Sequence, residues 1–228
     1  MKKFILLVSL IICVGMTAID TYRGYCYSDF RRRHYIKNMG YYPNGNVRER
    51  AILKNGKRDG ICEEYYSDGK LKSRSFYSNG KKYGMCETYY ENGRLESEGL
   101  YLDGKTQGWV VNRYKSGVIK EKIWYDCGIP YGYQTKYYPN GARQSVVCYE
   151  KDGKKTGEFF ECYSNGKLKR EGVYHNNKID GIVKEYYEDG KIKEIDFYDD
   201  GRKNGKCKLY DREGNIETTV YRYGESVK

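Results

Sequence analysis

The chain repeats itself with a period of about 24 residues, and this period constrains its fold more than any other feature. A glycine that follows Asn, Asp or a close relative recurs at this interval, apart from one step that is longer by a single residue. A second series of glycines keeps the same interval. The first series is Gly45, Gly69, Gly93, Gly117, Gly141, Gly166, Gly190 and Gly214, and the second is Gly60, Gly84, Gly108, Gly132, Gly157, Gly181 and Gly205. A fixed period of this length indicates an array of one supersecondary unit.

The pattern inside each unit predicts a β-hairpin. Asn-Gly or Asp-Gly between alternating apolar residues indicates a type I′ turn, because both central positions of that turn have positive φ. With Asp68-Gly69 as the turn, Tyr66 lies opposite Leu71 and Ile61 lies opposite Phe76, which are stabilising cross-strand pairs. We expect looser turns with a bulge in the links between hairpins. The sequence therefore predicts an all-β fold: an elongated antiparallel sheet of about eight hairpins, one for each period of the repeat.

The repeats occupy residues 35–228, so the chain has room for one repeat domain behind an N-terminal segment. Tyr is frequent, with 28 residues against 6 Phe and 2 Trp. Disorder is the alternative for a chain with so many charges, but disordered segments have few aromatic residues and few β-formers. The regular spacing of Tyr favours a folded sheet.

The N-terminal segment begins with two lysines and continues with the uncharged residues Phe4–Ile19. This stretch is shorter than the ~20 residues of a membrane-spanning helix, and with the small residue Ala18 it indicates a signal peptide or membrane anchor over residues 1–19. The large Met16 and the basic linker over residues 20–34 oppose cleavage and export. We expect an exported or membrane-anchored, extracytoplasmic protein, with a cytoplasmic location as the alternative.

The formal net charge is +11, which favours anionic partners in general. Acidic residues are interspersed along the repeats, a pattern typical of solvated faces, so we expect no specific nucleic-acid site. The basic run in the linker is the candidate for contact with an anionic membrane surface. It consists of Arg31, Arg32 and Arg33.

Histidine, a frequent catalytic base and metal ligand, is sparse in this sequence. His34 and His175 are the only histidines, and no serine-hydrolase, P-loop or zinc-protease motif occurs. Cys62 and Cys86 occupy one position of the repeat, so they lie two strands apart, ~9.5 Å, beyond the ~7 Å reach of a disulfide. We expect the cysteines to serve mostly as small apolar residues. The sequence predicts a non-enzyme without metal or cofactor.

The units "EYYSDGKLKSRSFYSNGKKYG", "TYYENGRLESEGLYLDGKTQG" and "EYYEDGKIKEIDFYDDGRKNG" resemble the bacterial MORN-variant repeat. That repeat is the unit of proteins labelled YwqK-family antitoxins. The resemblance covers nearly all of the chain after Tyr35 and departs in "NRYKSGVIKEKIWYDCGIPYG". It implies a hairpin-repeat fold and a protein-binding role, as in an antitoxin that holds its toxin.

The departing units suggest where a protein partner would bind. Alternation along the strands places an apolar, aromatic-rich patch on the face shared by Ile61 and Phe76. Trp and Tyr dominate binding hot spots, and an exposed apolar patch marks interaction sites. The alternative is that the patch packs against another part of the sheet or another copy. The candidate residues are Trp109, Val111, Trp124, Tyr133 and Tyr137. Membrane-surface binding, glycan binding and a purely structural spacer are the other interpretations that the sequence leaves open.

Overall fold

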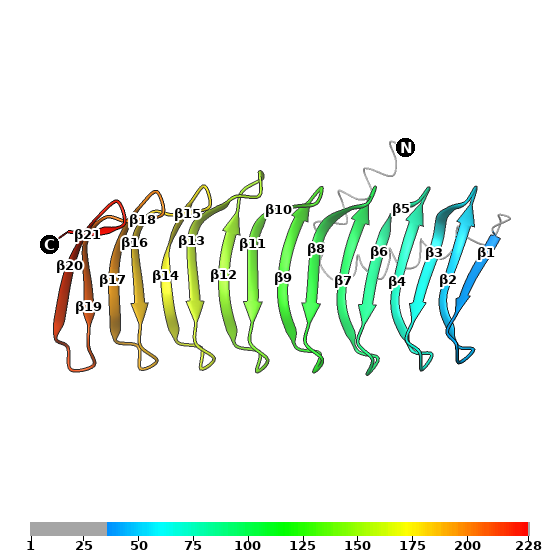
Figure 1. Ribbon diagram of the computed structural model, residues 1–228, viewed down its shortest axis with the longest axis horizontal. Helices are drawn as coiled ribbons and strands as arrows, with labels where there is room; N and C mark the ends of the chain where they lie inside the picture. Colours follow the sequence, from blue (N-terminus) through cyan, green and yellow to red (C-terminus); the bar gives the residue numbers. More distant parts are fainter. Residues whose placement is uncertain (1–35, 228) are drawn as a thin grey trace, which may run out of the picture. The chain divides into compact units, whose positions relative to one another are not determined.

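The computed structural model describes residues 36–227, and all regular structure in this range is β (Figure 1). Residues 36–227 contain no helix that could cross a membrane. The predicted all-β fold of antiparallel hairpins is confirmed. The predicted signal peptide or anchor over residues 1–19 lies outside the described residues, as does the linker over residues 20–34 with its run Arg31–Arg33.

The chain forms two compact units, and in each unit neighbouring strands pair antiparallel. Unit 1 contains described residues 36–110, and unit 2 contains residues 111–227; the chain passes from one to the other within β8. The strands of unit 1 are β1 (Ile36–Tyr41), β2 (Val47–Lys54), β3 (Lys57–Tyr65), β4 (Leu71–Ser78), β5 (Lys81–Lys82), β6 (Gly84–Tyr89), β7 (Leu95–Leu102) and most of β8 (Lys105–Arg113).

The strands of unit 2 follow the same pattern of long strands joined by turns and short link strands. They are β9 (Ile119–Asp126), β10 (Ile129–Pro130), β11 (Gly132–Tyr137), β12 (Arg143–Tyr149), β13 (Lys155–Cys162), β14 (Leu168–His175), β15 (Lys178–Ile179), β16 (Gly181–Tyr186), β17 (Ile192–Asp199), β18 (Arg202–Lys203), β19 (Gly205–Tyr210), β20 (Ile216–Arg222) and β21 (Glu225–Val227).

Every predicted hairpin turn is present, but the predicted turn type is wrong. The amide of Gly69 donates to the carbonyl of Tyr66 (2.9 Å), and the amide of Tyr66 donates to the carbonyl of Lys70 (2.8 Å). Gly69 has positive φ (86°), whereas Asp68 does not. This is a type I turn followed by a bulge at glycine. The carboxylate of Asp68 accepts the amide of Lys70 (3.0 Å), and this local bond favours the type I geometry.

The bulge changes only the residue pair next to the turn. Along the body of the hairpin Ile61 lies opposite Phe76, as predicted. Next to the turn, Leu71 lies opposite Tyr65 rather than the predicted Tyr66. Tyr66 is thereby released from cross-strand pairing.

The type I′ turns lie in the links, where we predicted looser turns. Asn79 and Gly80 both have positive φ, at 50° and 85°. The predicted bulge follows this turn, since Tyr83 still bonds to Phe76 while the pairing of β6 with β4 is shifted relative to that of β5. The one longer step of the repeat, between Gly141 and Gly166, replaces such a link by a type I turn ending at Gly153.

Within each unit, the released tyrosines bond one hairpin to the next. The hydroxyl of Tyr66 donates to the carbonyl of Tyr89 (2.7 Å), and that of Tyr163 donates to the carbonyl of Tyr186 (2.7 Å). Equivalent bonds are made by the hydroxyls of Tyr42, Tyr114, Tyr138 and Tyr187. In the last hairpin Asp211 occupies this position and bonds within its own turn, to Asn215. The repeat therefore needs Tyr, rather than any large apolar residue, before each turn.

Most of the buried side chains lie on one face of the strands, which we call the cysteine face because it carries Cys62 and Cys86 in unit 1 and Cys207 in unit 2. Its central row in unit 2 includes Phe159 and Val183, which are 2% and 1% exposed. Gly172 lies opposite Phe159, and a Cβ there would come within 2.9 Å of both side chains. These two residues fill the centre of the face in that part of unit 2.

Candidate functional site

The aromatic residues predicted to bind a partner are partly exposed. Trp109 belongs to unit 1 and is 43% exposed, whereas the other four belong to unit 2. Tyr133 is 62% exposed on β11, and Val111, Trp124 and Tyr137 are half-buried. Trp124 and Tyr133 share a face, because each lies two residues from the paired residues Lys122 and Thr135. The backbone partner of Trp124 is Tyr131, whose amide donates to the carbonyl of Trp124 (2.9 Å). Tyr137 also supplies the carbonyl that accepts the hydroxyl of Tyr114 (2.8 Å).

Within residues 36–227 no group of three or more His, Cys, Asp or Glu side chains is placed to hold a metal ion. The six cysteines in this range are all free thiols, and Cys62 and Cys86 are not joined. Burial raises the pKa of both thiols. A thiol that stays protonated is a poor nucleophile and a poor ligand, so these two cysteines act as small buried residues.

Sequence reasoning missed a groove on the cysteine face of unit 1. It has a volume of about 260 Å³ and runs across β2 to β8. Its floor consists of small residues, among them Cys62, Ser75, Cys86 and Gly99. Hydroxyl groups line it further toward the turns, where Thr88 and Ser97 bond to each other (2.7 Å). The groove exists because the central row of this face, unlike that of unit 2, is built from small side chains.

Two basic side chains lie at the end of the groove near the links. The guanidinium of Arg58 stands 5.4 Å from the ring centre of Tyr77, and the ammonium of Lys82 stands 5.0 Å from that of Tyr101. Arg58 is ion-paired with the carboxylate of Glu49. Lys82 is half-buried, and its described contact is the tyrosine ring. The two cations occupy the same position of successive repeats. Of these two, only Arg58 is ion-paired with a carboxylate of the described residues.

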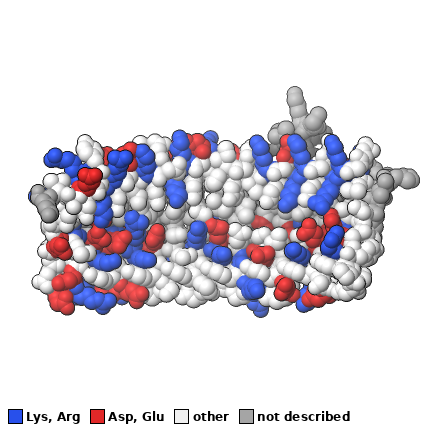
Figure 2. All heavy atoms as spheres, in the orientation of Figure 1, with Lys and Arg blue, Asp and Glu red and all other residues white. Residues whose placement is uncertain are grey.

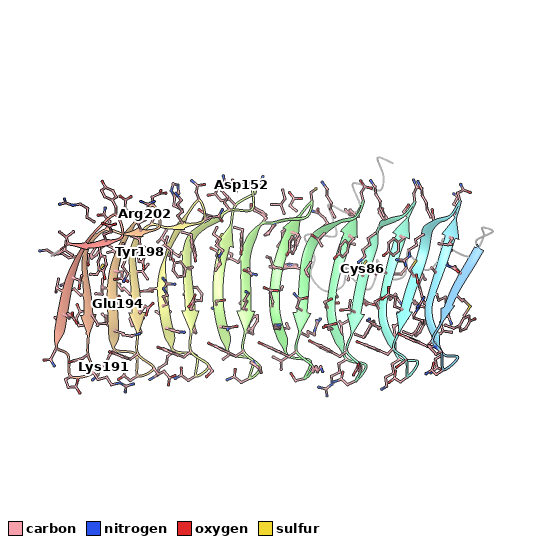
Figure 3. The ribbon with its side chains drawn as sticks, viewed as in Figure 1. Cys86, Asp152, Lys191, Glu194, Tyr198 and Arg202 are labelled. Carbon is pink, nitrogen blue, oxygen red and sulfur yellow. The ribbon has the colours of Figure 1, made fainter. Side chains whose placement is uncertain are left out.

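Two cations of unit 2 occupy the equivalent position. Lys155 faces the ring of Tyr174 at 5.1 Å. Lys203 lies five repeat steps after Lys82. The ammonium of Lys203 bonds to Glu194 (2.9 Å) and Asp196 (2.7 Å) and faces the ring of Tyr221 at 5.4 Å. Figure 3 labels Glu194 on β17 of unit 2 and Cys86 on β6 of unit 1. Burial lowers the pKa of Lys203, but its bonds to the two carboxylates outweigh burial and raise that pKa overall.

The carboxylates of unit 2 correspond to serines in unit 1. Five repeat steps back from Glu194 and Asp196 lie Ser73 and Ser75, and both serines line the groove. Glu49, the partner of Arg58, is one step before Ser73. Ser73 and Ser75 therefore stand at the repeat positions from which Arg58 and Lys203 receive carboxylates. Aligning the repeats by their glycines would have revealed this substitution. Whether the cation reaches a carboxylate, however, depends on the strands on both sides of it and on the bulges between them.

The comparisons with known proteins agree with the repeat assignment. Four segments match the family described as MORN repeat variant: residues 58–79, 82–103, 155–176 and 179–200. These are MORN-variant repeats, two in each unit, and together they cover less than half of the chain. No curated protein matches the sequence. MORN repeats generally act as modules that bind proteins or membranes.

Proposed function

We propose that this chain is a non-catalytic repeat scaffold that binds a partner protein. The observation that carries the proposal is an aromatic pair on one face of unit 2, formed by the exposed Tyr133 (62%) and the half-buried Trp124. Large aromatic side chains at the surface supply binding energy at low entropic cost. Tyr137 and Val111 extend this surface. An antitoxin-like role is the specific case in which the partner is a toxin.

A pull-down followed by affinity measurement tests this function. Replacing Tyr133 with Ser removes an exposed ring, so we expect at least a tenfold loss of affinity for the captured partner with no change in thermal stability. The matched control is Tyr131→Ser, which removes another exposed tyrosine from the link beside it. Equal binding by wild type and Tyr133→Ser would contradict the proposed surface.

A second candidate function, binding to an anionic membrane surface, is favoured by the lysines at the link turns of unit 1. Lysines follow each link turn there and are exposed (Figure 2). They are Lys57, Lys81 and Lys105. Such a row attracts anionic lipid headgroups, and the attraction falls as salt is added. Sedimentation with anionic liposomes at low and high salt decides between the two functions: salt-sensitive binding supports the membrane, and no binding at low salt rejects it.

Export or membrane anchoring through residues 1–19 remains part of the proposal. It rests on the basic start and the uncharged stretch that follows. Intact-mass measurement on protein from its native cells, with fractionation of membranes, is the test. A soluble cytoplasmic form that keeps residues 1–19 would contradict it.

A further inference from the structure

We propose that the groove of unit 1 is a binding site for a carboxylate side chain of an acidic protein segment, held by Lys82 with the hydroxyls of Ser73 and Ser75. This site lies on the cysteine face and does not depend on the aromatic surface around Tyr133. It goes beyond the proposed function by assigning a second surface and a chemical class of partner.

The first argument is the missing intramolecular partner. In two equivalent positions the chain supplies its own carboxylate to the cation, from Glu49 to Arg58 and from Glu194 and Asp196 to Lys203. At Lys82 the chain supplies serines instead. The ammonium is held over Tyr101 by the same ring contact as its counterparts. Lys155 also makes this contact without pairing with a carboxylate of the described residues, but Lys82 in addition lines the open groove, where an anion can reach it.

The second argument is space. Two serines stand where unit 2 has Glu and Asp, and their smaller side chains leave space beside the cation. The small floor residues Cys62, Cys86 and Gly99 leave the centre of the face open. The resulting volume of about 260 Å³ accepts a side chain together with part of its backbone. Serine hydroxyls can donate to the incoming oxygens, which the carboxylates of unit 2 cannot do.

The third argument concerns the kind of anion. The cation pairs with carboxylates elsewhere in this chain, in a geometry that the repeat reproduces. Glu64 also lines the groove and has an exposed carboxylate, which repels a doubly charged phosphate beside Lys82 more than it repels a single carboxylate. A singly charged carboxylate beside Lys82 therefore fits better than a phosphate.

The experiment measures binding of a fluorescein-labelled hexaglutamate peptide to the full chain by fluorescence anisotropy. Lys82→Gln should weaken binding about tenfold or more, because a charge-assisted hydrogen bond is lost. The matched control is Lys81→Gln, which removes one positive charge from the exposed neighbour that is paired with Asp103 (2.7 Å). Non-specific attraction to the net positive charge would be reduced equally by both changes, and equal effects would overturn the proposal.

A second pair of variants uses unit 2 as the template. Ser73→Glu should abolish specific binding while the protein stays folded, since it restores the carboxylate found at Glu194. The double variant Glu194→Ser with Asp196→Ser should free Lys203 but keep the stoichiometry at one peptide, because Phe159 and Val183 fill the centre of the face in unit 2. Circular dichroism confirms folding of each variant. Unchanged binding by Ser73→Glu contradicts the proposal even if the double variant does not fold.

Inorganic phosphate serves as the competing ligand. The carboxylate assignment predicts that phosphate displaces hexaglutamate only by general screening, to the same degree as chloride at equal ionic strength. Strong displacement by phosphate that is lost in Lys82→Gln would make this a phosphate site and overturn the assignment to a protein carboxylate. Loss of aromatic-surface binding in Tyr133→Ser should leave hexaglutamate binding intact, so the two proposals fail independently.

Discussion

The cysteine face is open in unit 1 and filled in unit 2, although both units repeat the same hairpin. In unit 1 its central row includes Cys62, Ser75 and Cys86, and a groove results. In unit 2 the row includes Phe159 and Val183, which are almost fully buried. The difference teaches that the turns and the tyrosine bonds hold the hairpins together, while side-chain size in one row decides between a core and a binding surface.

The largest effect is expected from truncating the filled row. Phe159→Ala should lower the free energy of unfolding by about 3–5 kcal/mol, because it leaves a cavity beside Val183. Cys86→Ala, at the equivalent position of unit 1, removes only one buried sulfur next to space that is already open and should cost about 1 kcal/mol. Chemical denaturation followed by circular dichroism measures both. Equal losses would mean that the two rows contribute alike and would break the comparison.

The tyrosine bonds should contribute equally in the two units. Tyr66→Phe and Tyr163→Phe each remove one hydroxyl that donates to a carbonyl of the next hairpin (2.7 Å in both). Each change should cost about 1 kcal/mol, since the half-buried ring is kept and one hydrogen bond is lost. Thermal or denaturant unfolding provides the measurement. A loss confined to one unit would show that the repeats are not joined in the same way.

The smallest effect concerns alkaline pH. Burial, followed by the hydrogen bond from its hydroxyl to Glu171 (2.7 Å), raises the pKa of Tyr186 to about 12. The raised value lies above the unfolded value of about 10, so the stability it contributes is complete below pH ~10 and is lost as the pH rises toward 12. Tyr186→Phe should flatten that part of the stability profile. Tyrosinate absorbance that saturates near pH 11 in the folded protein would contradict the shift.

The repeat, the all-β class and the register of the hairpin bodies follow from the sequence, because glycine spacing and alternation fix them locally. The turn types do not, since Asn-Gly and Asp-Gly suit both a type I′ turn and a type I turn with a bulge. At Asp68 the side chain bonds to the amide of Lys70 and selects the second form, whereas Asn79 takes positive φ in the link.

The candidate sites were predictable to different degrees. Alternation along the strands predicted a shared face for Trp124 and Tyr133, and the strand register supports it. The groove was not predicted, because its cation, its serines and its floor come from several strands whose lateral alignment depends on the link bulges. Cys62 and Cys86 were recognised as one row, but neighbours such as Ser75 and Gly99 had to be placed beside them before a hollow became visible.

One measurement tests the central claim most directly: the unfolding free energies of Lys203→Met and Lys82→Met, determined side by side by chemical denaturation. Loss of Lys203 leaves the buried carboxylate of Asp196 without its ion pair and should cost about 3 kcal/mol. Loss of Lys82 removes a contact with the ring of Tyr101 and should cost about 1 kcal/mol or less. A loss at Lys82 as large as that at Lys203 would contradict the account, since it would show that Lys82 already has its partner within the chain.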